Sequence, residues 1–221
     1  VEIDSKFSIR NTLEYLPDDL HQQLDYTNIG YQSYYIHHEE IKWLNNNHFN
    51  AYRLGEVRSN LAEIEPAIRN AYSINISLNA LKQQEAPGQE EISPNGFYSE
   101  EICQLAKYSG AADYAKIANL SGFTENPGFH TVILTAQIIW FLIFGYTIRI
   151  TENPTKDPHI KKFNVGQKKR GDNLIFYRSE KTERWWVEIP LHEQKENVIL
   201  PASYKDYVDA CNQQIPERWL K

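Results

Sequence analysis

Two histidines and two glutamates, residue types that can bind a metal, are adjacent in His37-His38-Glu39-Glu40. His37 and Glu40 are three residues apart, so they would share one face of a helix. A metal site needs three or four converging ligands, and the others would have to come from distant positions such as His130 or His159. The spacing is also not that of an HExxH zinc motif. We therefore interpret the cluster as a solvated helical face and assign no metal ligands.

Motifs for nucleophilic or phosphate chemistry are missing from the sequence. There is no GxSxG, GxxxxGK[ST] or GxGxxG, and neither Cys103 nor Cys211 has a histidine nearby in sequence. Asp172 and Glu188 could form a nuclease-like acidic pair, but proline stands at position 190, where such a pair needs a lysine. The sequence thus predicts no catalytic residue and no cofactor.

Basic residues gather between Lys156 and Arg184. This segment has nine basic and four acidic residues, which give it a net charge of +5. Because the whole chain has a net charge of −6, the remaining residues carry −11. Basic and aromatic side chains together can hold nucleic acid or an acidic protein, although the same residues could form a solvated turn and a core. The candidate binding residues are Lys161, Lys162, Lys168, Lys169, Arg170, Tyr177, Arg184 and Trp186. Alternation along residues 184–189 places Trp185 in the core and turns Trp186 outward.

The most apolar stretch runs from Thr131 to Phe144 and has no polar face at a helical or strand period. We interpret it as a central helix that is buried on all sides. A membrane span would have to extend beyond Gly145, where alternation instead indicates a strand at 146–151. The sequence therefore favours a soluble buried helix over a membrane span.

The remaining patterns indicate helices before this stretch and strands after it. Helices are expected from Pro17 to about Leu24, at about 28–44, and at 57–81 with a kink at Pro66. A helix capped by Ser99 should continue to about Leu120, rich in small residues that let the central helix approach. Residues 83–97 read as a loop, and strands are expected at 161–165, 174–178 and 184–189. A last helix, capped by Ser203, runs through Cys211.

Together these patterns predict a single α+β domain over residues 1–221. Its helical part covers 11–144, and a small antiparallel sheet with a closing helix covers 145–221. Two cysteines suggest no disulfide framework and favour the cytoplasm. The leading functional interpretation is a non-catalytic protein that binds a protein partner. The alternatives are a nucleic-acid-binding or processing protein using residues 161–186, and an enzyme whose site is assembled from distant residues such as His37, Glu40 and His130.

Overall fold

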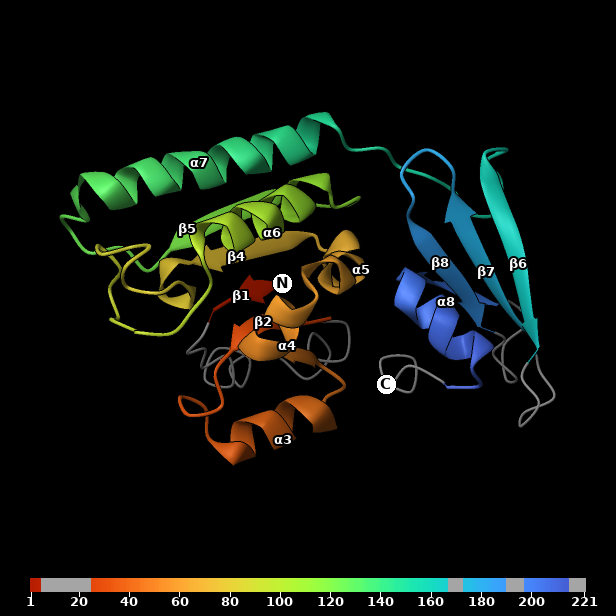
Figure 1. Cartoon of the computed structure of the whole chain (residues 1–221), viewed down its shortest axis with the longest axis horizontal. Helices are drawn as coiled ribbons and strands as arrows, with labels where there is room; N and C mark the ends of the chain where they lie inside the picture. The colour runs from red at the N-terminus through yellow and green to blue at the C-terminus, as the bar shows by residue number, and fades with distance from the viewer. Residues whose placement is uncertain (5–24, 167–172, 190–196, 215–221) are drawn as a thin grey trace. The chain divides into compact units, whose positions relative to one another are not determined.

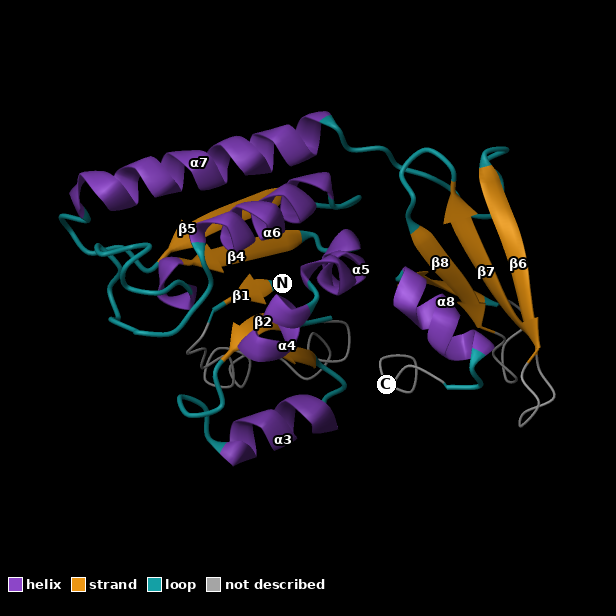
Figure 2. Ribbon diagram, viewed as in Figure 1, coloured by secondary structure: helices purple, strands orange, loops and turns teal. Residues whose placement is uncertain are grey.

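The chain forms two compact units in a computed structural model that describes residues 1–4, 25–166, 173–189 and 197–214. Unit 1 comprises residues 1–64 and 68–149, and unit 2 comprises residues 65–67 and 150–221. Figures 1 and 2 show a layered α/β arrangement in the first and an antiparallel sheet with one helix in the second. The predicted helix at 17–24 lies outside the described residues.

Unit 1 is built on a parallel sheet. Its described strands are β1 (Glu2–Ile3), β2 (Thr27–Tyr31), β3 (Asn50–Arg53), β4 (Ser73–Ser77) and β5 (Ile117–Ser121). Their order across the sheet is β3-β2-β1-β4-β5, and every neighbouring pair is parallel. The chain moves outward from β1 to β3 and then returns to the other side of β1 with β4. The strand order therefore reverses between β1 and β4, which makes this the topological switch point of the sheet.

The sequence prediction missed two of these strands. Residues 57–81 were expected to form one long helix, but β4 occupies their second half. Residues 112–120 were expected to continue the helix after Ser99, but β5 begins at Ile117. Both strands alternate polar and apolar residues, as in Ser73-Ile74-Asn75-Ile76-Ser77. Five residues of alternation are too few to outweigh apolar steps of three and four taken over a longer window.

Short helices follow strands β2, β3 and β4 along the chain. These are α3 (His38–Asn46), α4 (Leu54–Ser59), a 3₁₀ turn η1 (Leu61–Ile64), α5 (Glu65–Arg69) and a 3₁₀ turn η2 (Leu78–Ala80). The helix expected at 28–44 is wrong in its first half, which holds β2, and right from His38 onward. Pro66 lies at the start of α5, where a missing backbone N–H costs nothing.

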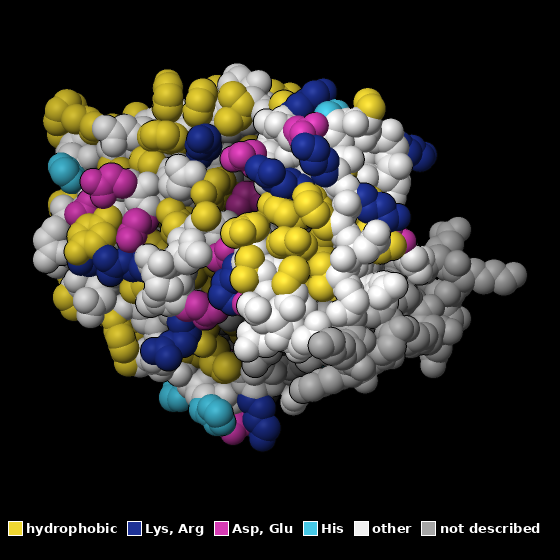
Figure 3. Space-filling view, turned by 45° about the vertical axis from the view of Figure 1, so that its right-hand side comes forward, with side chains coloured by type: hydrophobic (Ala, Val, Ile, Leu, Met, Phe, Trp, Pro, Cys, Tyr) yellow, Lys and Arg dark blue, Asp and Glu magenta, His cyan; other side chains and the backbone are white. Residues whose placement is uncertain are grey.

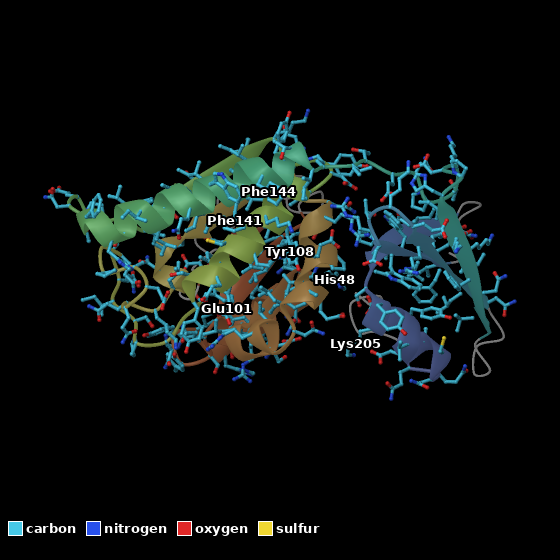
Figure 4. The ribbon with its side chains drawn as sticks, turned by 45° about the horizontal axis from the view of Figure 1, so that its top comes forward. His48, Glu101, Tyr108, Phe141, Phe144 and Lys205 are labelled. Atoms are coloured by element: carbon cyan, nitrogen blue, oxygen red, sulfur yellow. The ribbon has the colours of Figure 1, made fainter. Side chains whose placement is uncertain are left out.

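Two longer helices, α6 (Ser99–Ala111) and α7 (Gly128–Thr147), pack closely against each other. A Cβ on Gly110 would lie 2.1 Å from the Leu142 carbonyl oxygen, and one on Gly145 would lie 2.2 Å from that of Lys107. Figure 4 shows Tyr108 on α6 and Phe141 and Phe144 on α7. The prediction that the small residues of α6 let the apolar helix α7 pack closely against it is confirmed.

Only one face of α7 is buried, so the prediction of a helix buried on all sides is wrong. Thr131, Leu134, Ile138 and Gly145 face the unit. The opposite face exposes the large apolar side chains Phe129, Val132, Ile133, Ile139, Trp140, Ile143 and Tyr146. Figure 3 shows apolar side chains along the upper edge, where α7 runs. By length and composition α7 could cross a membrane, and along its buried face it packs on α6.

Truncation of neighbouring isoleucines tests which face of α7 is buried. Ile138 is fully buried and Ile139 is 43% exposed. Ile138→Ala should therefore lower the free energy of unfolding by about 2–5 kcal/mol, because it leaves a cavity in a packed interior. Ile139→Ala should cost less than about 1 kcal/mol in the same urea titration. Equal losses in the two variants would contradict this orientation.

Unit 2 is an antiparallel sheet with one described helix. Its strands are β6 (Ile160–Gly166), β7 (Asn173–Ser179), β8 (Trp185–Ile189) and β9 (Val198–Ala202), paired in chain order. The strands expected at 161–165, 174–178 and 184–189 are confirmed, and β9 was not predicted. The strand expected at 146–151 is wrong, because α7 continues to Thr147 and residues 148–151 are irregular. Helix α8 (Tyr204–Cys211) begins at the Ser203–Asp206 capping box, as expected. The expectation of a mostly helical α+β protein is nonetheless wrong, because a parallel α/β sheet organises unit 1.

Candidate functional site

A row of polar side chains crosses the middle of the parallel sheet in unit 1. Asn28 of β2, Glu2 of β1, Asn75 of β4 and Asn119 of β5 are register partners from strand to strand. Their neighbours in sequence are largely isoleucine and leucine, which point to the other face because side chains alternate along a strand. Ile3, Ile29 and Ile76 belong to the main apolar core. One face of the sheet is therefore core, and the other presents this amide row, the name we use for Asn28, Glu2, Asn75 and Asn119.

Hydrogen bonds connect three members of the amide row, Glu2, Asn75 and Asn119. The Tyr26 hydroxyl donates to Glu2 Oε2 over 2.6 Å, and Asn75 Nδ2 donates to Glu2 Oε1 over 3.4 Å. Asn75 Oδ1 in turn accepts from Asn119 Nδ2 at 2.7 Å and from the Ser121 hydroxyl at 3.2 Å. Residues separated by more than a hundred positions in the chain thus form one network.

The electrostatics of the network are set by burial. Burial raises the pKa of the Glu2 carboxyl, the Tyr26 hydrogen bond counteracts this in part, and the nearby charge of Asp4 raises it further. Burial, and then the adjacent Glu2 carboxylate, raise the pKa of Tyr26 well above its usual value. Tyr26 is therefore a hydrogen-bond donor at any physiological pH. The pKa of Glu2 is therefore closer to neutral pH than that of an ordinary carboxyl group, a property common among catalytic acids and bases.

One oxygen beside this network has no partner in the part of the chain that the structure describes. Asn28 is completely buried, and its Nδ2 donates to the Asp4 carbonyl oxygen over 3.4 Å. Its Oδ1 is buried and accepts no hydrogen bond from the described residues. A buried amide oxygen left unpaired costs free energy, so a bound donor would satisfy it.

The row lies next to the switch point between β1 and β4. In open α/β sheets, ligands bind outside the carboxyl ends of the strands at such a point. Here the strand ends are closed in by the loops that follow. Gly122, with φ of +78°, brings the chain after β5 so close to β4 that a Cβ would lie 3.0 Å from the Ser77 hydroxyl. The Asn79 side chain then accepts from the Glu91 N–H at 3.0 Å, which ties the 83–97 loop to the same edge.

The 83–97 loop was predicted as irregular chain, and no helix or regular strand is described in it. It is nevertheless anchored by Ala86 and Phe97, which are both completely buried. Phe97 lies beneath Gly30, where φ is +101° and a Cβ would come within 2.4 Å of the ring. Only glycine fits this end of β2, and Phe97 thereby holds the loop against the strand.

The binding residues predicted from sequence belong to unit 2, and the described ones mostly have intramolecular partners. Lys161 forms an ion pair with Glu180, and Lys162 lies 5.7 Å from the centre of the Tyr177 ring. Tyr177 donates to Glu188, and burial together with that carboxylate raises the pKa of Tyr177 to about 12. Arg184 donates to the Ile150 carbonyl oxygen over 3.2 Å. Lys168, Lys169 and Arg170 lie outside the described residues.

The two tryptophans of β8 differ from the prediction in one respect. Trp185 lies in the core of unit 2, as expected. Trp186 was expected to point outward and to be available for stacking, but it is only 5% exposed. The prediction of an exposed Trp186 is therefore wrong.

Glu152 is the centre of a second polar cluster, within unit 2. Its buried carboxylate accepts from Ser179, Thr182 and His159, the last over 2.8 Å. Although burial alone would raise the pKa of Glu152, these three hydrogen bonds hold it below its usual value. Ser179 donates to the carboxylate rather than to His159, so the cluster is not a nucleophile–base pair. It joins the β7–β8 turn to residues 152–159.

The metal-site alternative also finds no support in the described residues. His37 and His130 are both exposed, and residues 1–4, 25–166, 173–189 and 197–214 contain no group of three or more His, Cys, Asp or Glu side chains that could hold a metal. His48, which Figure 4 labels, is exposed in the turn between α3 and β3.

Comparison with solved structures identifies the fold of the larger unit. Formiminoglutamase from Trypanosoma cruzi, oxidized and with Mn²⁺ at pH 8.5, aligns with a TM-score of 0.57 and 15% identity over 67% of this chain and 55% of its own. Formimidoylglutamase from Bacillus subtilis aligns with a TM-score of 0.58 and 17% identity over 68% and 53%. An arginase superfamily protein from Trypanosoma cruzi gives 0.59 and 14% over 67% and 57%. Unit 1 has the fold of these proteins.

This likeness is one of structure alone. No family model matches the sequence, and no curated protein matches it. The chain spans about half the length of the solved structures that it resembles. Among the three interpretations drawn from sequence, the non-catalytic protein-binding one is the one that these enzyme neighbours contradict.

The manganese present in the Trypanosoma cruzi structure raises the question of whether unit 1 could hold such ions. Mn²⁺ is held in proteins chiefly by carboxylate and imidazole ligands. The amide row offers one carboxylate, from Glu2, and three neutral amides, and Asp4 adds one further carboxylate beside it. The described residues therefore do not fit a two-manganese centre.

Sequence reasoning missed this site because its members are far apart in the chain. Glu2, Tyr26, Asn75 and Asn119 belong to no local motif, and asparagine is not a residue that signals catalysis. The available signal was the alternation in β4 and β5, whose polar positions carry Asn75, Ser77, Asn119 and Ser121.

Proposed function

We propose that unit 1 is a catalytic domain that hydrolyses a C–N bond in a small substrate carrying an amidine-like group, of which the formimino group is the simplest. Support comes from the fold shared with formiminoglutamases and from the network around Glu2. Because the identity is low and about half of each neighbour is matched, the activity rests mainly on the residues of this chain.

The observation that carries the proposal is a buried carboxyl group at the switch point, held on both oxygens. Tyr26 and Asn75 each donate to one oxygen of Glu2, which fixes its orientation. A carboxylate with a raised pKa is a stronger base than an exposed one and suits general acid–base catalysis.

The proposed reaction uses Glu2 to move one proton. Ionised Glu2 takes a proton from a water molecule whose oxygen attacks the carbon of the protonated amidine group. The C–N bond to the substrate's amine then breaks, and Glu2 gives this proton to the leaving nitrogen. The remaining hydroxyl proton passes to solvent, so the products are an amine, an amide and the proton that the amidine group carried, and Glu2 ends in its starting state. Asn28 Oδ1 is an acceptor for the N–H groups of the substrate.

The state of the cysteines supports a cytoplasmic location, which we include in the proposal. Cys103 is buried and Cys211 is exposed, and both are free thiols. An exposed free thiol is compatible with a reducing compartment.

The test is a direct assay of the complete chain. N-formimino-L-glutamate and a second N-formimino amino acid are incubated with the protein, and amide release is followed by proton NMR. We expect release that is removed by Glu2→Gln and retained by Glu39→Gln, a matched change at an exposed position on α3. Equal rates for the unaltered chain and Glu2→Gln would contradict the proposal.

A further inference from the structure

We infer that the amide row itself holds no pair of divalent ions, because three of its four side chains are neutral amides and a site for such ions needs several carboxylates. The inference is independent of the proposed hydrolysis, since its readout is metal binding rather than turnover.

The first argument is charge. Two divalent ions bring a charge of +4, and sites for such hard cations are built from several ionised oxygens. The register pairs Glu2 with Asn28 on one side and with Asn75 on the other, and Asn75 with Asn119. Three of four consecutive positions across the sheet are therefore uncharged. Glu2 and Asp4 together compensate half of the charge of two ions.

The second argument is that the side-chain oxygens of Glu2 and Asn75 already accept hydrogen bonds. Both oxygens of Glu2 accept hydrogen bonds, from Tyr26 and from Asn75. Asn75 Oδ1 accepts two, from Asn119 and Ser121. A metal ion would have to displace these donors, and the Asn75 and Asn119 amide nitrogens cannot serve as ligands in return because they are donors only.

The third argument is that the other candidates lie apart. Within the described residues no further cluster of His, Cys, Asp and Glu reaches three members. His159 and Glu152 form a pair in unit 2, and that carboxylate is occupied by two hydroxyl donors as well.

The inference predicts that carboxylates at two amide positions create a cation site. Asn75→Asp combined with Asn119→Asp places two new carboxylates beside Glu2, one of them in the position from which Asn75 Nδ2 now reaches Glu2. Three adjacent carboxylates repel one another unless a cation joins them. The double variant should therefore melt at a lower temperature than the unaltered chain in EDTA and recover with Mn²⁺.

The experiment measures Mn²⁺ binding to metal-stripped protein by electron paramagnetic resonance of the free ion. We expect no stoichiometric binding by the unaltered chain, and binding at least about tenfold tighter by the Asn75→Asp/Asn119→Asp variant. The matched control is Asn45→Asp/Asn46→Asp, which adds the same charge at two exposed positions of α3 and should bind like the unaltered chain.

Other outcomes decide the matter as follows. Two Mn²⁺ ions bound per unaltered chain, and lost in Glu2→Gln, would overturn the inference. If the unaltered chain and Glu2→Gln bind Mn²⁺ equally, the ion binds away from the amide row, and this outcome supports the inference. A folded double variant that gains no affinity would show that the amides are not what excludes the metal. If the double variant does not fold, the titration of the unaltered chain and Glu2→Gln decides alone.

Discussion

Glu2→Gln is expected to lower the rate of formimino hydrolysis by about 10²–10⁴-fold, the range that a general acid–base group contributes. Glutamine keeps the shape of the side chain and an oxygen that accepts from the Tyr26 hydroxyl, but it cannot take a proton. Because Glu2 acts when ionised, the rate of the unaltered enzyme should rise with pH through the raised pKa of this group.

The same substitution is expected to stabilise the protein at neutral pH. The pKa of Glu2 in the folded protein lies above its usual value of 4.5. Below that value both folded and unfolded states hold the proton, so Glu2→Gln should change the melting temperature little. As pH rises, the unfolded state releases its proton first, and stability is lost until the folded-state pKa is passed. The variant escapes this loss, and its melting temperature should exceed that of the unaltered chain at pH 7 to 8.

Tyr26→Phe separates positioning from catalysis at this site. The Tyr26 hydrogen bond favours the ionised form of Glu2, so its removal should move the rising limb of the pH–rate profile to higher pH. Activity should return at high pH in this variant and not in Glu2→Gln. A Glu2→Gln protein that is both less stable and fully active would instead make Glu2 a structural residue.

Trp185→Ala is expected to lower the free energy of unfolding by about 3–5 kcal/mol, because it empties the centre of the unit 2 core. The Trp185 ring stacks on Tyr207 with centroids 4.9 Å apart and contacts Phe163 at 5.4 Å. These three rings join β6, β8 and α8, so the cavity would affect all three elements. Urea titration followed by tryptophan fluorescence and circular dichroism measures the loss.

Tyr204→Ala is the matched control for this prediction. Tyr204 also contacts the Trp185 ring, with centroids 5.7 Å apart, but it is 61% exposed. Its truncation should cost less than about 1 kcal/mol, since little apolar area leaves a buried environment. A Trp185→Ala loss no larger than that of Tyr204→Ala would contradict the packing of unit 2.

The sequence alone determined the local features that nearest neighbours in the chain control. The Ser203–Asp206 capping box and the strands β6, β7 and β8 could all be predicted. In each case a short pattern, such as a cap or a polar/apolar alternation bounded by turn residues, already favours one backbone conformation. The close approach of α6 and α7 also followed from composition, because small side chains permit it.

The tertiary structure decided which pattern prevails where two compete, and which residues meet. The segment containing Ile74 and Ile76 fits a helical spacing as well as a strand, and pairing with β1 and β5 selects the strand. The exposure of Ile139 depends on which other elements cover α7, and the local sequence does not specify those elements. The amide row exists only because parallel strands bring Glu2, Asn75 and Asn119 into register across the sheet. Long-range pairing of this kind depends on contacts between distant segments, so a pattern within one segment cannot specify it.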